Sequence, residues 1–415
     1  MLLRIHVEQL RLGMHVHELC GSWMDHPFWR GAFLLDNQQD LQSLLATSIK
    51  EVWIDDAKGL GVLTEAGEPA GLSEQIVAEE VEATLAEAIS SSKSVEHTNV
   101  AQEAARAVKI CAKSKKAVAS MFSEARMGKA LSEDDALPIV EEISTSVLRN
   151  PGALISLARL KDKDDYTYMH SVAVCALMVS LARQLGLNDD QVRQAGLAGL
   201  LHDVGKMMIP LKILNKPGKL TDAEFAAVQS HPAKGHQMLL EGKGISAISL
   251  DVCLHHHEKV DGSGYPEKLS DKQISLYAKM GAVCDVYDAI TSNRPYKNGW
   301  EPAESLRKMA EWSKGHFDNI IFHAFVKSIG IYPIGSLVKL ESDHLGVIID
   351  QTGKSLLLPV VKVFFSIKSN CRIPHQIMDM SKPACKNKIV SHEDPVKWGI
   401  DDIHELWSGM TPTPW

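Results

Sequence analysis

Histidine and aspartate side chains cluster in a few short stretches between residues 170 and 285. The stretch HHHEKVDGSGYP, from His255 to Pro266, holds three adjacent histidines and then a run rich in glycine. Other candidates are His170, the adjacent pair His202 and Asp203, His231 and Asp285. Neutral imidazole binds metal ions, protons or hydrogen-bond partners, so these residues indicate metal-binding chemistry.

The candidate ligands are too many for one ion but suit two. They are His170, His202, Asp203, His231, His256, His257 and Asp285. Nitrogen and oxygen ligands favour iron or manganese, with nickel, cobalt or zinc as alternatives, and the lack of thiolates argues against a structural zinc site. Two ions about 3.5–4 Å apart can clamp a phosphodiester during in-line attack. Successive helical residues point about 100° apart, so we expect His256 and His257 to be ligands and His255 to face away.

Positive charge accompanies these residues. Lys206 follows Asp203 by one turn, and Arg294 and Lys297 lie just past the predicted helix that carries Asp285. Arginine binds phosphate through two parallel hydrogen bonds, and lysine acts as a point charge. In a chain of net charge −8, this local charge favours a small phosphate ester as substrate over a nucleic-acid polymer or a membrane surface.

Most candidate ligands fall at or near the ends of predicted helices, and Asp285 lies inside one. Residues 168–187 are apolar on nearly all sides, which predicts a buried helix. The helix that ends in LLHDVGK has Gly205 where a C-cap glycine belongs. Thr221 and Glu224 form the sequence pattern of a capping box. Side chains converging from several helices are how helical bundles build metal sites.

The chain divides into four predicted parts, and the fold class is mainly α. Residues 1–66 form a small α/β module and residues 67–130 a helical, acidic connector. Residues 131–330 form the helical catalytic domain, and residues 331–415 a small β-rich segment.

Composition places the chain in the cytoplasm. No apolar run approaches the roughly 20 residues of a membrane span. The seven cysteines are scattered singly, without a CxxC pair. Their odd number fits reduced thiols rather than a disulfide framework.

The motifs together resemble the HD-GYP family of cyclic dinucleotide phosphodiesterases, a branch of the HD metal-dependent phosphohydrolases. The matching stretches are YMHSVAV, LLHDVGKMMIPLKILNKPGKLTDAEF, HPAKGHQML, HHHEKVDGSGYP and AVCDVYDAITSNRPYK. They occur in order between about residues 166 and 297, and with flanking helices the resemblance covers roughly half of the chain.

The resemblance implies a role for each candidate. One metal ion would be held by His170, His202, Asp203 and Asp285, and Asp203 would bridge to a second ion held by His231, His256 and His257. Lys206 would lie beside the scissile phosphate, Arg294 and Lys297 would bind substrate phosphate, and Tyr265 would sit near the substrate. Glu258, Asp261 and Asp288 either orient imidazoles or serve caps and turns. The family reaction is hydrolysis of cyclic di-GMP to linear pGpG, and often on to GMP, in bacterial signalling.

Two alternatives stay open. The substrate could be another cyclic dinucleotide such as 3'3'-cyclic GMP-AMP, because the recognisable residues touch phosphate and metal rather than bases. Alternatively, the protein could bind the dinucleotide without hydrolysing it and act as a receptor or adaptor. Residues 1–66 could serve a protein partner or a homodimer in either case.

The number of ions follows from one departure from the family pattern. Some members carry an acidic ligand for a third metal one turn before the first histidine, where this chain has Tyr166. We therefore expect two metal ions per chain. Metal analysis of an anaerobic preparation, followed by separation of the products from cyclic di-GMP, tests this; three ions per chain would contradict it.

Overall fold

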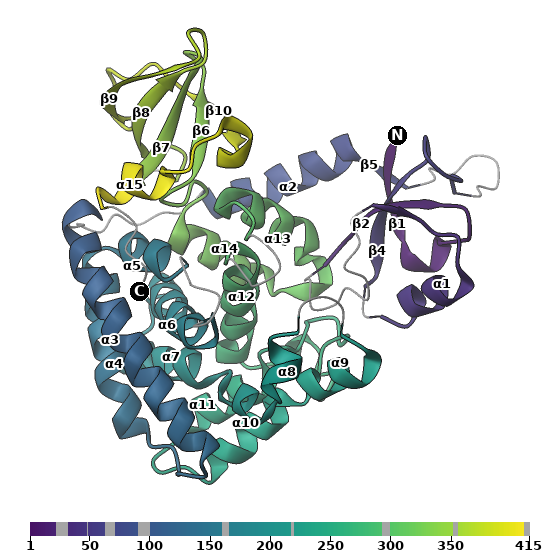
Figure 1. Ribbon diagram of the computed structural model, residues 1–415, viewed down its shortest axis with the longest axis vertical. Helices are drawn as coiled ribbons and strands as arrows, with labels where there is room; N and C mark the ends of the chain where they lie inside the picture. Colours follow the sequence, from purple (N-terminus) through teal and green to yellow (C-terminus); the bar gives the residue numbers. More distant parts are fainter. Residues whose placement is uncertain are drawn as a thin grey trace.

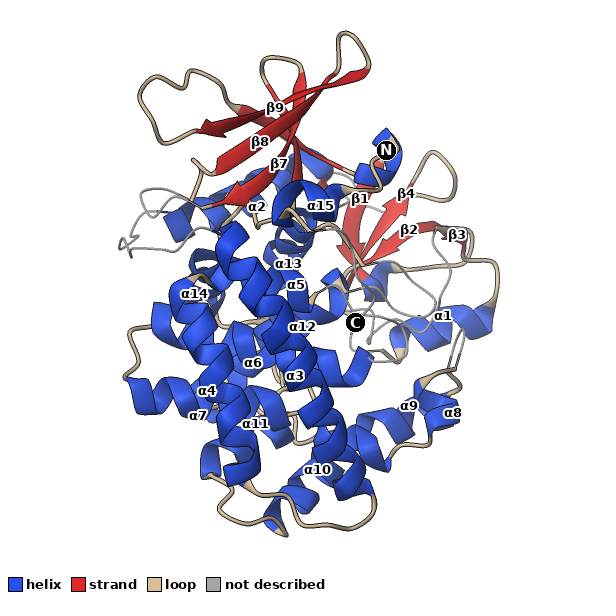
Figure 2. Cartoon of the chain, turned by 60° about the vertical axis from the view of Figure 1, so that its left-hand side comes forward, coloured by secondary structure: helices blue, strands red, loops and turns tan. Residues whose placement is uncertain are grey.

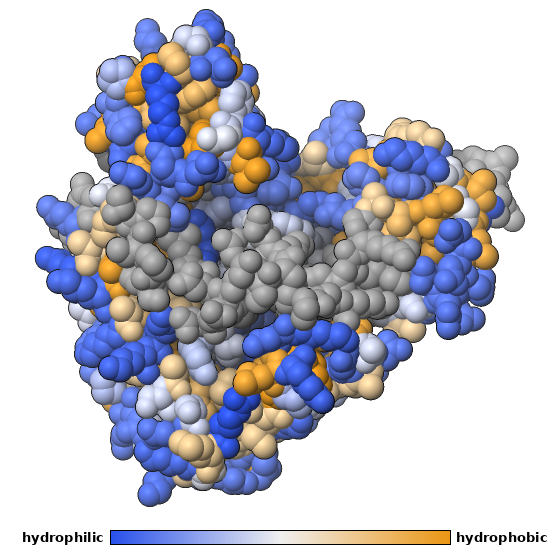
Figure 3. Space-filling view, viewed as in Figure 1, coloured by the Kyte–Doolittle hydropathy of each residue, from blue (hydrophilic) through white to orange (hydrophobic). Residues whose placement is uncertain are grey.

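Two small antiparallel sheets flank a helical body in the computed structural model (Figure 1). The structure describes residues 1–21, 32–47, 49–62, 71–89, 100–159, 166–216, 220–292, 299–351 and 356–410. The predicted mainly helical fold with a small sheet near each end of the chain is confirmed. In the space-filling view, hydrophilic residues cover much of the visible face and apolar residues form smaller groups (Figure 3).

The first sheet, together with one helix, forms the N-terminal module. Its strand order is β3-β2-β4-β1-β5, and Leu3 of β1 pairs with Ser73 of β5, so the sheet extends beyond residue 66. Apolar residues of β1, β2 and β4 form a core of their own with α1. The elements are β1 (Leu2–His6), η1 (Val7–Gln9), β2 (His15–Leu19), β3 (Phe33–Leu34), α1 (Gln38–Leu45), β4 (Glu51–Asp55) and β5 (Leu72–Ser73).

The segment expected to be a connector contributes two helices to the helical body. Helix α2 (Glu74–Ile89) packs against α13 and α14, and α3 (Val100–Arg126) packs against α4, α5 and α6. The inner face of α3 includes Ala104, Ala107 and Phe122, at helical spacing. Its buried Glu103 accepts two hydrogen bonds of 2.7 Å from Arg149 of α4.

The rest of the body surrounds α6, which is buried over most of its length, as predicted (Figure 2). The capping box of Thr221 and Glu224 is also confirmed, at the start of α9. The remaining helices are α4 (Glu133–Arg149), α5 (Pro151–Ala158), α6 (Tyr166–Gln184), α7 (Asp189–Leu201), η3 (Val204–Met208), α8 (Leu211–Leu214), α9 (Asp222–Gln229), α10 (His231–Leu240), α11 (Ala247–His255), η4 (Asp271–Gln273), α12 (Leu276–Thr291), α13 (Pro302–His316) and α14 (Asn319–Ile329).

Gly205 has a different role from the predicted C-cap. It lies inside η3, where a Cβ would stand 2.0 Å from the carbonyl oxygen of His231 and 2.5 Å from the backbone nitrogen of Gly235. The absence of a side chain lets the backbones of η3 and α10 touch. Asp203 directly precedes η3 and His231 begins α10. The contact between the two backbones therefore sets the distance between these two candidate ligands.

The second sheet follows the helical body. Its strand order is β10-β6-β7-β8-β9, and the terminal helix α15 returns to contact β7 and α3. Within the described residues, we find no helix with the length and apolar character needed to cross a membrane. The elements are β6 (Leu337–Leu340), β7 (His344–Asp350), β8 (Val360–Ser366), β9 (Cys371–Asp379), β10 (Ile389–Glu393), η5 (Pro395–Trp398) and α15 (Ile403–Ser408).

The Gly205 contact predicts a loss of stability on substitution. Gly205→Ala is expected to lower the free energy of unfolding by about 1–3 kcal/mol, because the new methyl group meets backbone that has little room to shift. Urea unfolding followed by circular dichroism measures this. Gly61→Ala is the control, since a Cβ at Gly61 meets only the Cβ of Asp56, at 3.8 Å. Equal stability of the two variants would contradict the prediction.

Candidate metal centre

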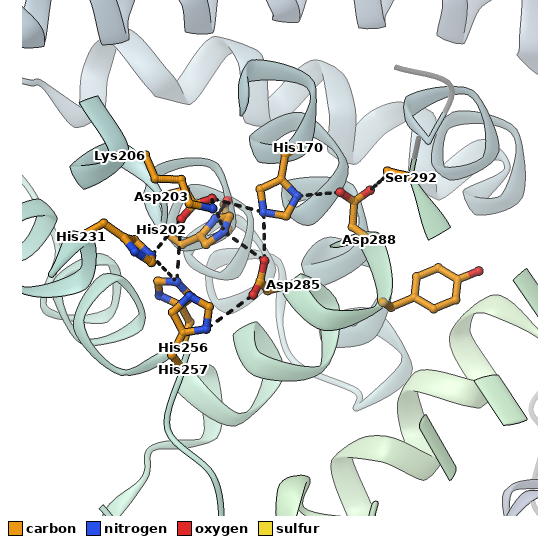
Figure 4. A network of polar contacts seen from close by, with 12 residues as sticks. His170, His202, Asp203, Lys206, His231, His256, His257, Asp285, Asp288 and Ser292 are labelled. Carbon is orange, nitrogen blue, oxygen red and sulfur yellow. Dashed lines mark hydrogen bonds and ion pairs between the residues drawn. The ribbon is translucent and has the colours of Figure 1, made fainter. Parts of the chain in front are cut away.

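All seven candidate ligands converge on one place inside the helical body (Figure 4). The helix interior supplies His170, from α6, and Asp285, from α12. His202 and Asp203 lie between α7 and η3, and His231 is the first residue of α10. His256 and His257 directly follow α11. Their buried side chains form three overlapping groups of possible ligands: His170, His202 and Asp285; His231, His256 and His257; and His202, Asp203 and His256.

Helix ends orient three of the imidazoles. The Nδ1 atom of His202 lies 2.8 Å from the carbonyl oxygen of Gly199, and that of His231 lies 2.7 Å from the carbonyl oxygen of Val228. For His256 the corresponding distance to the carbonyl oxygen of Val252 is 3.0 Å. A carbonyl accepts from an N–H, so Nδ1 carries the proton and Nε2 is left with a lone pair for a metal.

Asp203 stands between two halves of the centre. Its Oδ2 lies 3.3 Å from Nε2 of His170 and 3.5 Å from Nε2 of His202. Its Oδ1 lies 3.2 Å from Nε2 of His231 and 3.9 Å from Nε2 of His256. Each carboxylate oxygen therefore faces a different set of imidazoles, as a bridging ligand requires.

The centre fits a pair of cations. Within the described part of the chain, Nε2 of His202, Nε2 of His257 and Oδ2 of Asp285 are buried and make no hydrogen bond. Buried polar atoms without partners are rare in folded proteins. Imidazole nitrogens and carboxylate oxygens, without thiolates, are the donors that first-row divalent ions accept. Bound cations would satisfy these atoms.

The charge states also suit metal binding. Burial would raise the pKa of the Asp203 carboxyl, but Lys206 and the surrounding imidazoles hold it well below its usual range. Burial and the neighbouring His202 and His231 lower the pKa of His256 to about 3. Burial and His256 likewise hold the pKa of His257 well below its usual value. Ionised carboxylates and neutral imidazoles are the forms that bind metals.

His170 is the exception, because three carboxylates surround it. Burial alone would lower its pKa, but hydrogen bonds with Asp203, Asp285 and Asp288 raise the pKa to about 9. The distances are 2.9 Å from Nε2 to Oδ1 of Asp285 and 2.6 Å from Nδ1 to Oδ2 of Asp288. A cation at this position would take the place of the proton on Nε2.

Of the four residues predicted to bind substrate, the structure describes Lys206 and Tyr265, and both lie beside the centre. Lys206 forms an ion pair with Asp203 at the edge of the centre. The Tyr265 ring stacks on His257, with centroids 4.7 Å apart, and the Tyr265 N–H donates to the carbonyl of His257 over 3.2 Å. Arg294 and Lys297 lie outside the described residues, as does the side chain of Tyr166.

The structure distinguishes the neighbouring polar residues. Asp288 binds the ring of His170 on the side away from the centre. The imidazole of His255 contacts Asp251 and Glu267 instead of the ligands. Glu258 accepts hydrogen bonds from the backbone N–H groups of Glu267 and Leu269, so it stabilises the turn.

Two family models match the chain. One described as "HD domain" matches residues 152–321, and it contains all seven candidate ligands. The other is described as "Domain of unknown function (DUF3391)" and matches residues 2–136.

Curated relatives match over different lengths. Cyclic di-GMP phosphodiesterase PA4108 of Pseudomonas aeruginosa is 55 % identical over 411 residues, which cover 99 % of this chain and 96 % of that protein. 3'3'-cGAMP-specific phosphodiesterase 1 of Vibrio cholerae is 36 % identical over 40 % of this chain and 38 % of its own length. Cyclic di-GMP phosphodiesterase response regulator RpfG of Xanthomonas campestris is 36 % identical over 43 % of this chain and 47 % of its own length.

The contact between Asp288 and His170 predicts a loss of metal affinity. Asp288→Asn is expected to weaken Mn²⁺ binding about 10- to 100-fold, because the amide no longer fixes and polarises the imidazole. Competition with a chromophoric chelator measures the affinity. Asp251→Asn is the matched control, since Asp251 makes the same kind of contact, at 2.8 Å, to His255 outside the centre. A similar affinity in both variants would refute the role given to Asp288.

Proposed function

The chain belongs to the HD-GYP family of cyclic dinucleotide phosphodiesterases, and from that premise we propose that it hydrolyses cyclic di-GMP to linear pGpG with the help of two divalent ions. Near full-length similarity to the Pseudomonas aeruginosa phosphodiesterase supports the substrate. The observation that carries the reaction is the placement of Asp203, whose two oxygens face two separate sets of buried imidazoles. Iron and manganese are the proposed ions, with nickel, cobalt and zinc as alternatives, because nitrogen and oxygen donors suit all five.

The residues divide the work in this proposal. His170, His202 and Asp285 would hold one ion, His231, His256 and His257 would hold the other, and Asp203 would join the two sets. When bound, such an ion pair supplies a nucleophile at neutral pH and neutralises charge on the phosphodiester. The chain itself keeps the ligands oriented through the backbone carbonyls and Asp288, and shields them from bulk water by burial.

Lys206 is the nearest described cation to Asp203. Its ammonium group pairs with the carboxylate at the edge of the centre and remains partly exposed. We assign it to a phosphate oxygen of the substrate, where a fixed positive charge stabilises the charge that develops during attack. Tyr265, stacked on His257, is assigned to the wall of the substrate site.

A second candidate substrate is 3'3'-cyclic GMP-AMP. The Vibrio cholerae relative named as a 3'3'-cGAMP-specific phosphodiesterase supports it, although that similarity covers 40 % of this chain. Both dinucleotides present the same phosphodiester to Asp203 and Lys206. Turnover of the two compounds at equal concentration separates the candidates.

The assignment of Asp203 and Lys206 predicts two different losses. Asp203→Ala is expected to abolish both metal binding and turnover, because it removes the ligand shared by the two sets. Lys206→Met is expected to retain metal and to lower kcat by about 10²-fold. Removal of a single group that stabilises transition-state charge typically has an effect of this size. Metal analysis and chromatography of pGpG measure the two effects.

Lys234→Met, on the exposed face of α10, is the control for Lys206→Met. Full turnover by Asp203→Ala would refute the mechanism. A wild-type protein that holds two ions and binds cyclic di-GMP, but releases no product from either dinucleotide, would point to a receptor instead of an enzyme.

A further inference from the structure

The N-terminal module is docked on α13 through partly buried polar contacts. Glu311 of α13 accepts a hydrogen bond of 2.7 Å from the indole N–H of Trp53 in β4. Arg4 of β1 donates to the carbonyl oxygen of Glu311 over 3.2 Å, and Lys308 pairs with Glu18 at 2.7 Å. These directional contacts fix the position of the module relative to the helical body.

The same end of α13 holds the loop that follows the metal ligands. The N–H groups of Val260 and Asp261 donate to the carbonyls of His316 and Gly315, over 3.3 and 3.1 Å. Gly315 has a φ of +89°, and a Cβ there would lie 3.1 Å from a carboxylate oxygen of Asp261. The loop and the module therefore meet at one end of one helix, and glycine allows the close approach.

Lys50 connects the module to the loop directly. It stands just before β4, and its ammonium group forms an ion pair with the carboxylate of Asp261. The same carboxylate accepts hydrogen bonds from the backbone N–H and the hydroxyl of Ser263, at 2.8 and 2.6 Å. The side chain of Lys50 is 58 % exposed and that of Asp261 is 17 % exposed, so the ion pair lies at the surface and the carboxylate is its less exposed partner.

The loop leads back to the metal centre within a few residues. Gly262 donates its N–H to the carbonyl of Lys259 over 2.9 Å, and Tyr265 donates to the carbonyl of His257. The ring of Tyr265 lies against the imidazole of His257. A displacement of Asp261 and Ser263 would therefore move Tyr265 relative to a predicted metal ligand.

We propose that Lys50 is a positioning residue of the substrate site, and that the N-terminal module supplies it. Lys50 holds Asp261, Asp261 holds the turn through Ser263, and the turn places Tyr265 beside the bound dinucleotide. The module lies within residues 2–136, which match a domain of unknown function, and it thereby becomes part of the substrate site of its own chain. This inference rests on the proposed function for the identity of the substrate and for the assignment of Tyr265 to the substrate site.

The expected size of the effect follows from the exposure of the pair. A groove lined by Lys50, Lys259 and Lys314 opens beside Asp261, so water and salt screen the interaction. Ion pairs of this exposure change an equilibrium by about two- to fivefold. Since Tyr265 is assigned to substrate binding, we expect loss of the ion pair to alter KM rather than kcat.

The kinetic test uses the full-length protein loaded with metal. Lys50→Met is expected to raise KM for cyclic di-GMP about two- to fivefold, with kcat and metal content unchanged, and Lys50→Arg to restore the wild-type KM. Lys58→Met is the control, because Lys58 is 59 % exposed and pairs with Asp55 inside the same module. In an Asp261→Asn background, Lys50→Met should have no further effect. Independent, multiplying effects of the two substitutions would overturn the inference.

A second measurement does not depend on turnover. Amide hydrogen exchange at residues 259–266 is expected to be about two- to fivefold faster in Lys50→Met than in Lys58→Met, because the turn opens more often without the ion pair. Equal exchange in the two variants would overturn the positioning role even in a protein that is inactive on cyclic di-GMP. Absence of product from the wild-type protein, with faster exchange in Lys50→Met, would instead count against the proposed function alone.

Discussion

The structure depends on the burial of seven ionisable side chains at one point inside the helical body. Each of them is at most 7 % exposed, and charged or polar groups removed from water need compensating partners. The pKa values of both carboxyls lie well below their usual range, and in the described structure Nε2 of His202, Nε2 of His257 and Oδ2 of Asp285 make no hydrogen bond. The fold removes the seven side chains from water, and bound ions would act as partners for their polar atoms. The stability of the helical body and the binding of metal therefore depend on each other.

Backbone geometry controls this arrangement more than side-chain packing does. Three imidazoles bind carbonyls of the helix that precedes them, which fixes the ring and leaves Nε2 for the centre. The contact between Gly205 and α10 then fixes how closely two of the ligand-bearing segments approach. A centre built on helix ends can thus tolerate changes on the outer faces of the same helices.

Much of the centre could be predicted from the sequence, because local spacing carries the information. The pair His202 and Asp203, or His256 and His257 at a helix end, can be recognised without knowing the fold. The role of Asp288 could not be separated from capping until α6 was placed beside α12. Lys50 gave no signal in the sequence, since it stands 211 positions before Asp261 and one exposed lysine resembles any other.

In the fold, too, features set by local sequence could be predicted, and features set by contacts between distant segments could not. The buried helix around His170 follows from its apolar composition. By contrast, α3 lies in a stretch whose sequence predicts a connector, because the acidic and alanine-rich residues before it conceal its narrow buried face. Small residues such as Ala104 and Ala107 are weak hydrophobic signals in a sequence, yet they allow α3 to pack closely on its neighbours. Packing of this kind depends on distant helices, so only the assembled structure reveals it.

The order of the ligands along the chain has a consequence for biosynthesis. The ligands extend from His170 to Asp285, so the group of His170, His202 and Asp285 stays incomplete until α12 has left the ribosome. The N-terminal module is made before the helical body, yet its docking partners Lys308 and Glu311 are made after α12. The complete set of seven ligands is therefore available only after α12 has been made, so full loading of the centre follows synthesis of the ligand-bearing helices.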